Sequence, residues 1–122
     1  MTQARRGLGQ RGEQLAAERL QALGYEIVER NYRCTAGEID LVAQKAGRWV
    51  FVEVRTRRGS RYGTPEESLT ARKRAHLIAS AQHYLQAHAQ IDVDWRIDAV
   101  AVVLSTGGRL ERIDVIENAV TG

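Results

Sequence analysis

Two neighbouring segments decide the fold of this chain: GEIDLV at residues 37–42 and WVFVEVR at residues 49–55. Both are rich in β-branched and aromatic residues, which is typical of β-strands. Side chains alternate across a strand with a period of two, so Glu53 and Arg55 share the face that carries Phe51. We therefore predict two strands of a sheet, each with charge where a buried strand is normally apolar.

A hairpin through KAGR at residues 45–48 would make these two strands neighbours. Asp40 of the first strand and Glu53 of the second could then converge on one cation. An acid and a base two residues apart on an apolar strand, as Glu53 and Arg55 are, cost free energy to bury unless something pairs with them. The pattern D-x12-E-x-R therefore suggests a metal site for cutting a phosphodiester bond.

Mg²⁺, or Mn²⁺ in its place, is the cofactor that this pattern favours, because hard cations take carboxylate, water and phosphate oxygens as ligands. Asp40 and Glu53 would supply the carboxylates, and the Val54 carbonyl is a further candidate. The ion would polarise the scissile phosphate and make hydroxide available near neutral pH. Arg55 would neutralise charge on the phosphoryl oxygens. It cannot be a general base, because guanidinium stays protonated.

A helix is predicted upstream of these strands, from about Gly12 to Leu23, with Gly24 ending it. Its apolar positions recur at helical spacing: Ala16, Ala17, Leu20 and Leu23. Glu13 falls on this stripe at the expected first turn. It is either a partner of the helix N-terminal dipole or a functional acid that could hold a ligand water or a second ion.

The remaining elements complete one domain of 122 residues, in which residues 1–9 are expected to be a loose arm. A second helix should run from a cap at Thr70 to about Ala89. The predicted strands cover residues 25–32, 38–44, 49–56, 95–104 and 110–116. The order α-β-β-β-α-β-β predicts an α/β fold with a mixed sheet flanked by helices.

The charge of the chain is unevenly distributed. The whole chain carries +3, but between Lys45 and Arg74 nine basic residues face three acids. Arginine suits bidentate phosphate contacts, although an ordinary solvated surface explains such a cluster equally well. A loop at residues 57–65 interleaves arginines with one tyrosine. The residues expected to contact nucleic acid are Arg57, Arg58, Arg61, Tyr62, Arg72 and Lys73.

Basic residues also open the second helix, where Arg72, Lys73 and Arg74 follow the cap. Cations at a helix N-terminus oppose the helix dipole, and a bound anion would offset that cost. Lys73 lies on the same side as Leu77, so it could reach the sheet as a second cation for the site.

Several of these residues have a purely structural alternative. Glu53 and Arg55 could simply pair with each other. Asp40 could accept hydrogen bonds from the turn at residues 35–37. Glu38, beside a glycine at the strand start, is expected to be a structural or rim acid.

Other polar residues are expected to be structural. Asp98, within an apolar strand, should brace an arginine such as Arg96 or Arg112. The second helix carries three histidines that make a poor metal site and are expected at the surface or in packing: His76, His83 and His88.

The cellular setting is expected to be the cytoplasm, without a membrane. A single cysteine, Cys34, excludes an intramolecular disulfide and a cysteine-rich zinc site. No apolar run approaches the roughly 18 residues of a membrane span. The first residues show no apolar segment of a secretory signal.

The chain resembles the YraN family of small, functionally uncharacterised bacterial proteins over nearly its whole length. The most specific blocks are GEIDL at residues 37–41 and FVEVR at residues 51–55. Further blocks are GQRGE at 9–13, GY at 24–25, RNYR at 30–33, YG at 62–63, YL at 84–85 and RID at 96–98. That family is similar to the PD-(D/E)XK nucleases, with an αβββαβ restriction-endonuclease-like core, and among them to archaeal Holliday-junction resolvases.

The resemblance implies that Glu13, Asp40 and Glu53 bind metal and that Arg55 occupies the position of the catalytic cation. The superfamily motif ends in lysine, and arginine is not equivalent to it. The implied activity is that of a magnesium-dependent endonuclease, a hydrolase acting on DNA, with branched or distorted DNA as an expected substrate. The alternatives are a non-catalytic nucleic-acid-binding module with the same fold and a protein-interaction domain. Junction resolvases work as dimers, so a homodimer is an open expectation, although no stripe of residues marks an interface.

Overall fold

The computed structural model describes residues 3–59 and 69–120, which form two helices and five strands. In chain order these are α1 (Gln3–Ala22), β1 (Glu26–Cys34), β2 (Gly37–Lys45), β3 (Arg48–Arg58), α2 (Ala71–Ala87), β4 (Trp95–Leu104) and β5 (Leu110–Ile116). The predicted order of elements is confirmed. The limits of β4 and β5 agree with the prediction to the residue, whereas β1, β2 and β3 are each longer than predicted.

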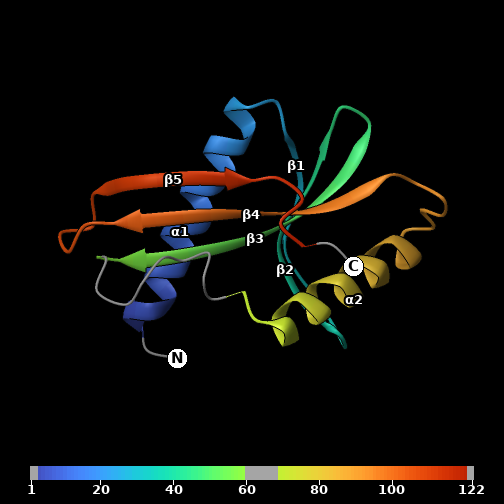
Figure 1. Ribbon diagram of the computed structural model, residues 1–122, viewed down its shortest axis with the longest axis horizontal. Helices are drawn as coiled ribbons and strands as arrows, with labels where there is room; N and C mark the ends of the chain where they lie inside the picture. Colours follow the sequence, from blue (N-terminus) through green and yellow to red (C-terminus); the bar gives the residue numbers. More distant parts are fainter. Residues whose placement is uncertain (1–2, 60–68, 121–122) are drawn as a thin grey trace.

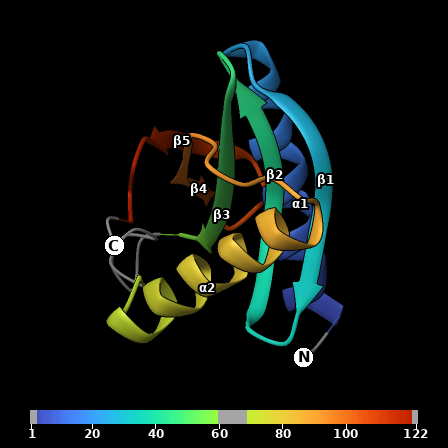
Figure 2. The same cartoon turned by 90° about the vertical axis from the view of Figure 1, so that its right-hand side faces the viewer.

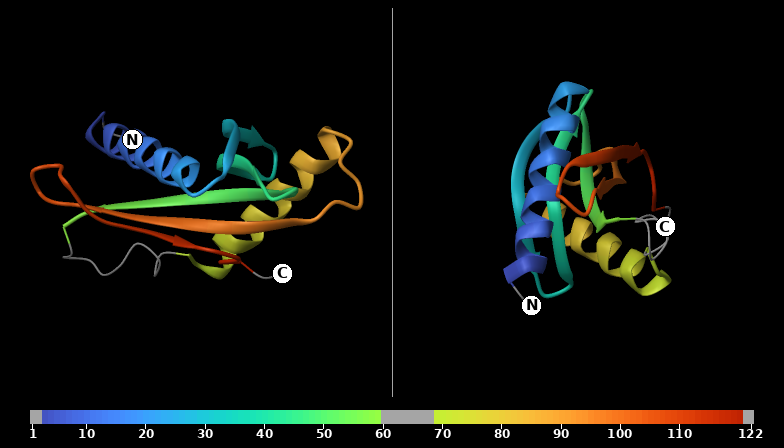
Figure 3. Two further views of the ribbon diagram at one scale, coloured as in Figure 1. Left: turned by 90° about the horizontal axis from the view of Figure 1, so that it is seen from above. Right: turned by 90° about the vertical axis from the view of Figure 1, so that its left-hand side faces the viewer.

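The strands form one mixed sheet in the order β1-β2-β3-β4-β5. All neighbours are antiparallel except β3 and β4, which run parallel and are connected through α2. A parallel pair needs such a long crossover connection. α1 and α2 lie on opposite faces of the sheet (Figures 1 and 3). This is the predicted α/β architecture, consistent with a restriction-endonuclease-like core.

The side-chain alternation along β3 divides the core into two halves. Val50 and Val52 pack beneath α1, whereas Phe51 packs beneath α2. Burial of each such side chain contributes about 1.5–3 kcal/mol. Figure 2 shows α2 crossing β1, β2 and β3. Leu77 and Tyr84 of α2 belong to the same buried cluster as Phe51. The far ends of β3, β4 and β5 extend beyond α2 (Figure 1).

The first helix is longer than its apolar pattern indicates. It begins at Gln3, so the expectation of a loose arm over residues 1–9 is wrong for residues 3–9, which are helical. The stretch from Gln3 to Gly9 contains a single large apolar residue, Leu8, and its two glycines are poor helix formers. Leu8 packs against the α1 side of the core, and this tertiary contact outweighs the weak local propensity.

The second helix begins as predicted. Thr70 is its N-cap and accepts a hydrogen bond from the Lys73 backbone N–H at 3.2 Å. The loop predicted at residues 57–65 starts later, because Arg57 and Arg58 still belong to β3. Arg61 and Tyr62 lie outside the described residues.

The buried carboxylate of Asp98 forms hydrogen bonds with residues before β1, on β4 and after β5. Asp98 is fully buried and accepts hydrogen bonds from the Tyr25 hydroxyl at 2.8 Å and the Arg96 guanidinium at 2.9 Å. The backbone N–H of Asn118 is a third donor. Asp98 therefore braces Arg96, as predicted, rather than Arg112. Within residues 3–59 and 69–120, no helix is long and apolar enough to cross a membrane.

Candidate functional site

A cavity of about 660 Å³ lies where β2 separates from β3. Its walls come from α1, the β1–β2 hairpin, β3 and the first turn of α2. The lining residues are Gly9, Gln10, Glu13, Asn31, Arg33, Glu38, Asp40, Glu53, Val54, Arg55 and Lys73. All four residues predicted to be catalytic, Glu13, Asp40, Glu53 and Arg55, are thus brought together at one cavity.

Asp40 takes its position from the end of a strand ladder. The pairing of β2 with β3 stops at Leu41 and Val52. Beyond that point the Val54 backbone N–H donates to the Asp40 carboxylate at 2.8 Å instead of to a strand carbonyl. The carboxylate is therefore fixed by β3 itself, and the alternative in which the turn at residues 35–37 supplies its donors is wrong.

The charge of Asp40 is strongly disfavoured. Burial, and then the nearby Glu53 carboxylate, raise the pKa of Asp40 to about 8, against the opposing effect of the Val54 hydrogen bond. The charges of Glu13 and Glu38 also raise the pKa of Asp40. A carboxyl group whose pKa is raised by burial and by neighbouring carboxylates is frequent at functional sites.

Glu53 is the most buried acid of the cavity, with its side chain only 4% exposed. The Arg55 guanidinium lies 3.2 Å from its Oε1, and the Lys73 ammonium lies 3.6 Å from the same atom. Burial raises the pKa of Glu53 although both cations oppose this. Glu53 and Arg55 thus form the pair that the structural alternative describes, and Lys73 reaches from α2 to the sheet as expected.

Glu13 projects into the cavity from the middle of α1. Because the helix begins at Gln3, Glu13 is far from the first turn, and the dipole explanation is wrong. Its Oε1 is buried without a hydrogen-bond partner among the described residues. Burial first, and then the charges of Glu38 and Glu53, raise the pKa of Glu13. A buried carboxylate oxygen without a partner is costly unless a ligand completes it.

Comparison with known proteins places the chain in a family. The sequence pattern of the uncharacterised protein family UPF0102 matches residues 12–102. The chain belongs to UPF0102. A UPF0102 protein of Dehalococcoides mccartyi is 47% identical over 119 residues, covering 98% of this chain and 97% of that relative. One from Symbiobacterium thermophilum is 50% identical over 114 residues, covering 93% and 96%. The resemblance to the YraN family is thereby confirmed.

The UPF0102 match includes every predicted metal-binding acid: Glu13, Asp40 and Glu53 lie within residues 12–102. UPF0102 is described as an uncharacterised family. The function of this UPF0102 protein must therefore be argued from the cavity.

The rim of the cavity contains residues that sequence reasoning did not assign to the site. Arg33 pairs with Glu38 at 3.1 Å, and both side chains are exposed, which agrees with Glu38 as a rim acid. Asn31 lies within β1 with a φ of 54°, in the left-handed region that non-glycine residues rarely adopt. The RNYR block at residues 30–33 was the available signal, but nothing in it points to the cavity rather than to a strand.

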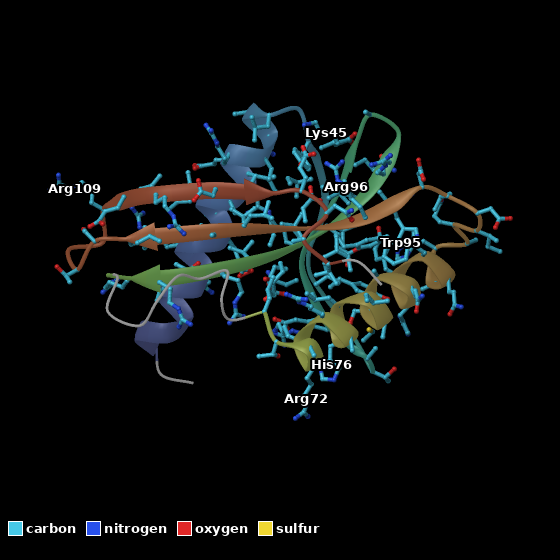
Figure 4. All side chains as sticks on the ribbon, viewed as in Figure 1. Lys45, Arg72, His76, Trp95, Arg96 and Arg109 are labelled. Atoms are coloured by element: carbon cyan, nitrogen blue, oxygen red, sulfur yellow. The ribbon has the colours of Figure 1, made fainter. Side chains whose placement is uncertain are left out.

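Of the residues predicted to contact nucleic acid, those that the structure describes lie on β3 and in the first turn of α2. Lys73 lines the cavity, and Arg57 and Arg58 continue along β3 beyond Arg55. Arg72 is exposed on the outer side of α2 and points away from the sheet (Figure 4). The structure thus brings Lys73, but not Arg72, to the acids.

His76 and His83 on α2, and His88 at its C-cap, have the structural roles expected of them or lie at the surface. His83 hydrogen-bonds the Tyr32 hydroxyl at 2.6 Å, and the His88 ring stacks on Tyr84 with ring centres 3.9 Å apart. His76 is exposed.

A bound ion requires the acids of the cavity to change their contacts. In the part of the chain that the structure describes, no three His, Cys, Asp or Glu side chains are already arranged to hold a metal ion. The carboxylates have other partners: Asp40 accepts a hydrogen bond from the Val54 amide, and Glu53 forms ion pairs with Arg55 and Lys73. The donor chemistry nevertheless fits Mg²⁺, since three carboxylates share the cavity and one buried oxygen lacks a partner.

Proposed function

We propose that this UPF0102 protein is a magnesium-dependent endonuclease that hydrolyses phosphodiester bonds in DNA. The observation that carries the proposal is the convergence of Glu13, Asp40 and Glu53, from three different elements, on one cavity beside two cations. The raised pKa of each acid supports it, because burial disfavours the charged form of all three carboxylates and a divalent cation would stabilise that form. For Glu13 and Asp40 the cation would also offset the repulsion from neighbouring carboxylates.

The proposed metal ligands are Asp40 and Glu53, with Glu13 holding a further oxygen position. A bound Mg²⁺ would polarise the scissile phosphate and lower the pKa of a coordinated water. Asp40 is oriented for this task by the Val54 amide, whose hydrogen bond fixes one carboxylate oxygen. Glu13 offers the unpartnered oxygen described above.

Arg55 and Lys73 are the proposed electrostatic partners of the phosphate. Both lie beside Glu53, and both side chains are partly exposed, Arg55 at 28% and Lys73 at 38%. When Glu53 binds a metal, its charge is no longer available to these cations. They can then neutralise negative charge on the phosphoryl oxygens, which is the usual role of Arg and Lys at phosphoryl-transfer sites. Lys73 would provide, from α2, the lysine that β3 lacks.

The proposed partner is DNA, because the cations Arg55 and Lys73 at the cavity and the basic surplus of the sequence between Lys45 and Arg74 suit a phosphate backbone. Arg57 and Arg58 extend this charge along β3, away from the acids. A branched or distorted substrate, a homodimer and a cytoplasmic location belong to the same proposal and follow from the resemblance to junction resolvases and from the single free cysteine, Cys34.

A second candidate is a nucleic-acid-binding module without catalysis. The ion pairs of Glu53 favour it, since Arg55 and Lys73 already neutralise the most buried acid without any metal. In this alternative the acids organise the cations, and the cations bind phosphate.

Cleavage of a DNA panel separates the two candidates. The panel contains linear, flapped, single-stranded and four-way DNA, incubated with Mg²⁺, with Mn²⁺ or with EDTA. We expect metal-dependent cleavage that is lost in Asp40→Asn and in Glu53→Gln, with Glu18→Gln as a control on the exposed side of α1.

Binding without cleavage, unchanged by EDTA, would instead support the non-catalytic module. Absence of both cleavage and salt-dependent binding would refute both candidates, because phosphate contacts necessarily weaken as salt rises.

A further inference from the structure

Helix α1 contains glycines at positions where the sequence gives no local reason for them. Glycine is among the poorest helix formers, yet Gly7, Gly9 and Gly12 all lie within α1. A Cβ added at Gly7 or Gly9 would meet nothing within 4 Å. A Cβ at Gly12 would stand 1.8 Å from Oγ1 of Thr56. Gly12 is therefore the point where the helix backbone lies directly against β3.

The conflict at Gly12 could not be removed by a rotation of the Thr56 side chain. The added Cβ would also lie 2.9 Å from the Thr56 Cβ, which does not move when χ1 changes, and 3.0 Å from Cγ2. Any side chain at residue 12 must consequently push α1 and β3 apart. Interiors this closely packed transmit such a displacement to neighbouring residues.

We propose that Gly12 is a positioning residue for the carboxylate of Glu13. The contact between Gly12 and Thr56 sets the distance between α1 and β3. Glu13 is the next residue on the helix, and Glu53 lies three residues before Thr56 on the strand. One backbone contact thus fixes the separation between the acid of the helix and the buried acid of the sheet. The inference rests on the proposed function, because it assigns to Gly12 the geometry of the metal-binding acids.

The first test is the dissociation constant for Mn²⁺, measured by isothermal titration calorimetry. We expect Gly12→Ala to weaken binding about tenfold, the lower end of the loss seen when a residue supporting a metal ligand is changed. The matched control is Gly7→Ala, in the same helix but exposed and without neighbours. It should bind Mn²⁺ within about twofold of the wild type.

Two further variants distinguish positioning from a general structural effect. In the exchange variant Gly12→Ala/Thr56→Gly, the side chain is moved from the strand to the helix, and affinity should return to within about threefold of Thr56→Gly alone. In a Glu13→Gln background, Gly12→Ala should change the affinity by less than about twofold. A carboxylate that is absent cannot be misplaced.

The outcomes separate this inference from the proposed function. A wild type that binds no Mn²⁺ would overturn the proposed function, and this inference with it. If Gly12→Ala binds Mn²⁺ as tightly as the wild type, the inference alone is overturned. The same holds if Gly12→Ala weakens Mn²⁺ binding as much in the Glu13→Gln background as in the wild type. If circular dichroism shows that Gly12→Ala does not fold, the exchange variant decides. Recovery of folding and Mn²⁺ binding supports the inference, and failure of both overturns it.

Discussion

Asp40 combines a fixed position with a disfavoured charge. The Val54 amide holds its carboxylate, while burial and the Glu53 charge raise the pKa of Asp40 to about 8. An acid whose pKa is higher in the folded protein than in the unfolded chain stabilises the fold below the unfolded pKa, near 3.8. That stabilisation is lost as the pH rises through the folded pKa near 8. The raised pKa values of Glu13 and Glu53 act in the same direction.

Removing this charge should therefore stabilise the metal-free protein at alkaline pH. We expect Asp40→Asn, which keeps an oxygen for the Val54 amide, to raise the free energy of unfolding near pH 8.5 by on the order of 1–3 kcal/mol. At about pH 4 the difference should largely disappear. Urea denaturation in EDTA at both pH values measures this. Parallel pH profiles of the two proteins would show that Asp40 is not forced to carry an unfavourable charge.

Arg55 is the residue at which this chain departs from the lysine of the nuclease motif. Its Nη1 donates a hydrogen bond to Oε1 of Glu53 at 3.2 Å. We expect Arg55→Ala to lower metal-dependent cleavage by about 10²–10³-fold, as when a single oxyanion partner is lost. Arg55→Lys should instead raise cleavage above the wild type, because an ammonium is a compact charge of the kind that the superfamily motif places at this position. Initial cleavage rates of the three proteins test this. A lysine variant as weak as the alanine variant would contradict it.

At the scale of elements, the first turn of α2 brings Lys73 to the sheet. Thr70 caps this turn by accepting the Lys73 backbone N–H. We expect Thr70→Ala to reduce the free energy of unfolding by about 1 kcal/mol. Thr70→Ser, which keeps the acceptor oxygen, should lose much less. Thermal unfolding of the three proteins measures the difference, and equal midpoints for all three would show that the cap does not hold this turn.

The two helices also show what sequence patterns can and cannot predict. The cap at Thr70 and the stripe with Leu77 are local features, and they predicted the start of α2 correctly. The start of α1 depends on the packing of Leu8 on the core, which no local pattern contains. The convergence of the acids was predictable because hairpin pairing of β2 and β3 places Asp40 near Glu53. The Val54 donor was not, because it depends on where that ladder ends.

At the scale of the whole molecule, Asp98 joins regions that are distant in the sequence. It is fully buried on β4 and accepts hydrogen bonds from Tyr25 before β1, from Arg96 on its own strand and from Asn118 after β5.

Asp98→Ala leaves three donors, one of them charged, without their acceptor. We expect a loss of about 3–5 kcal/mol in the free energy of unfolding. Tyr25→Phe should cost about 1–3 kcal/mol, because Arg96 and Asn118 still serve the carboxylate. Urea denaturation tests both, and an Asp98→Ala protein as stable as Tyr25→Phe would contradict the network.

The central claim is that Glu13, Asp40 and Glu53 form one divalent-cation site. The most direct measurement is a crystal structure of the protein grown with Mn²⁺, with anomalous scattering used to locate the ion. We predict a single strong peak in the cavity, at ligand distance from the oxygens of Asp40 and Glu53, that is absent from crystals of Asp40→Asn. A cavity without a peak at saturating Mn²⁺, or a peak held by other residues, would contradict the account.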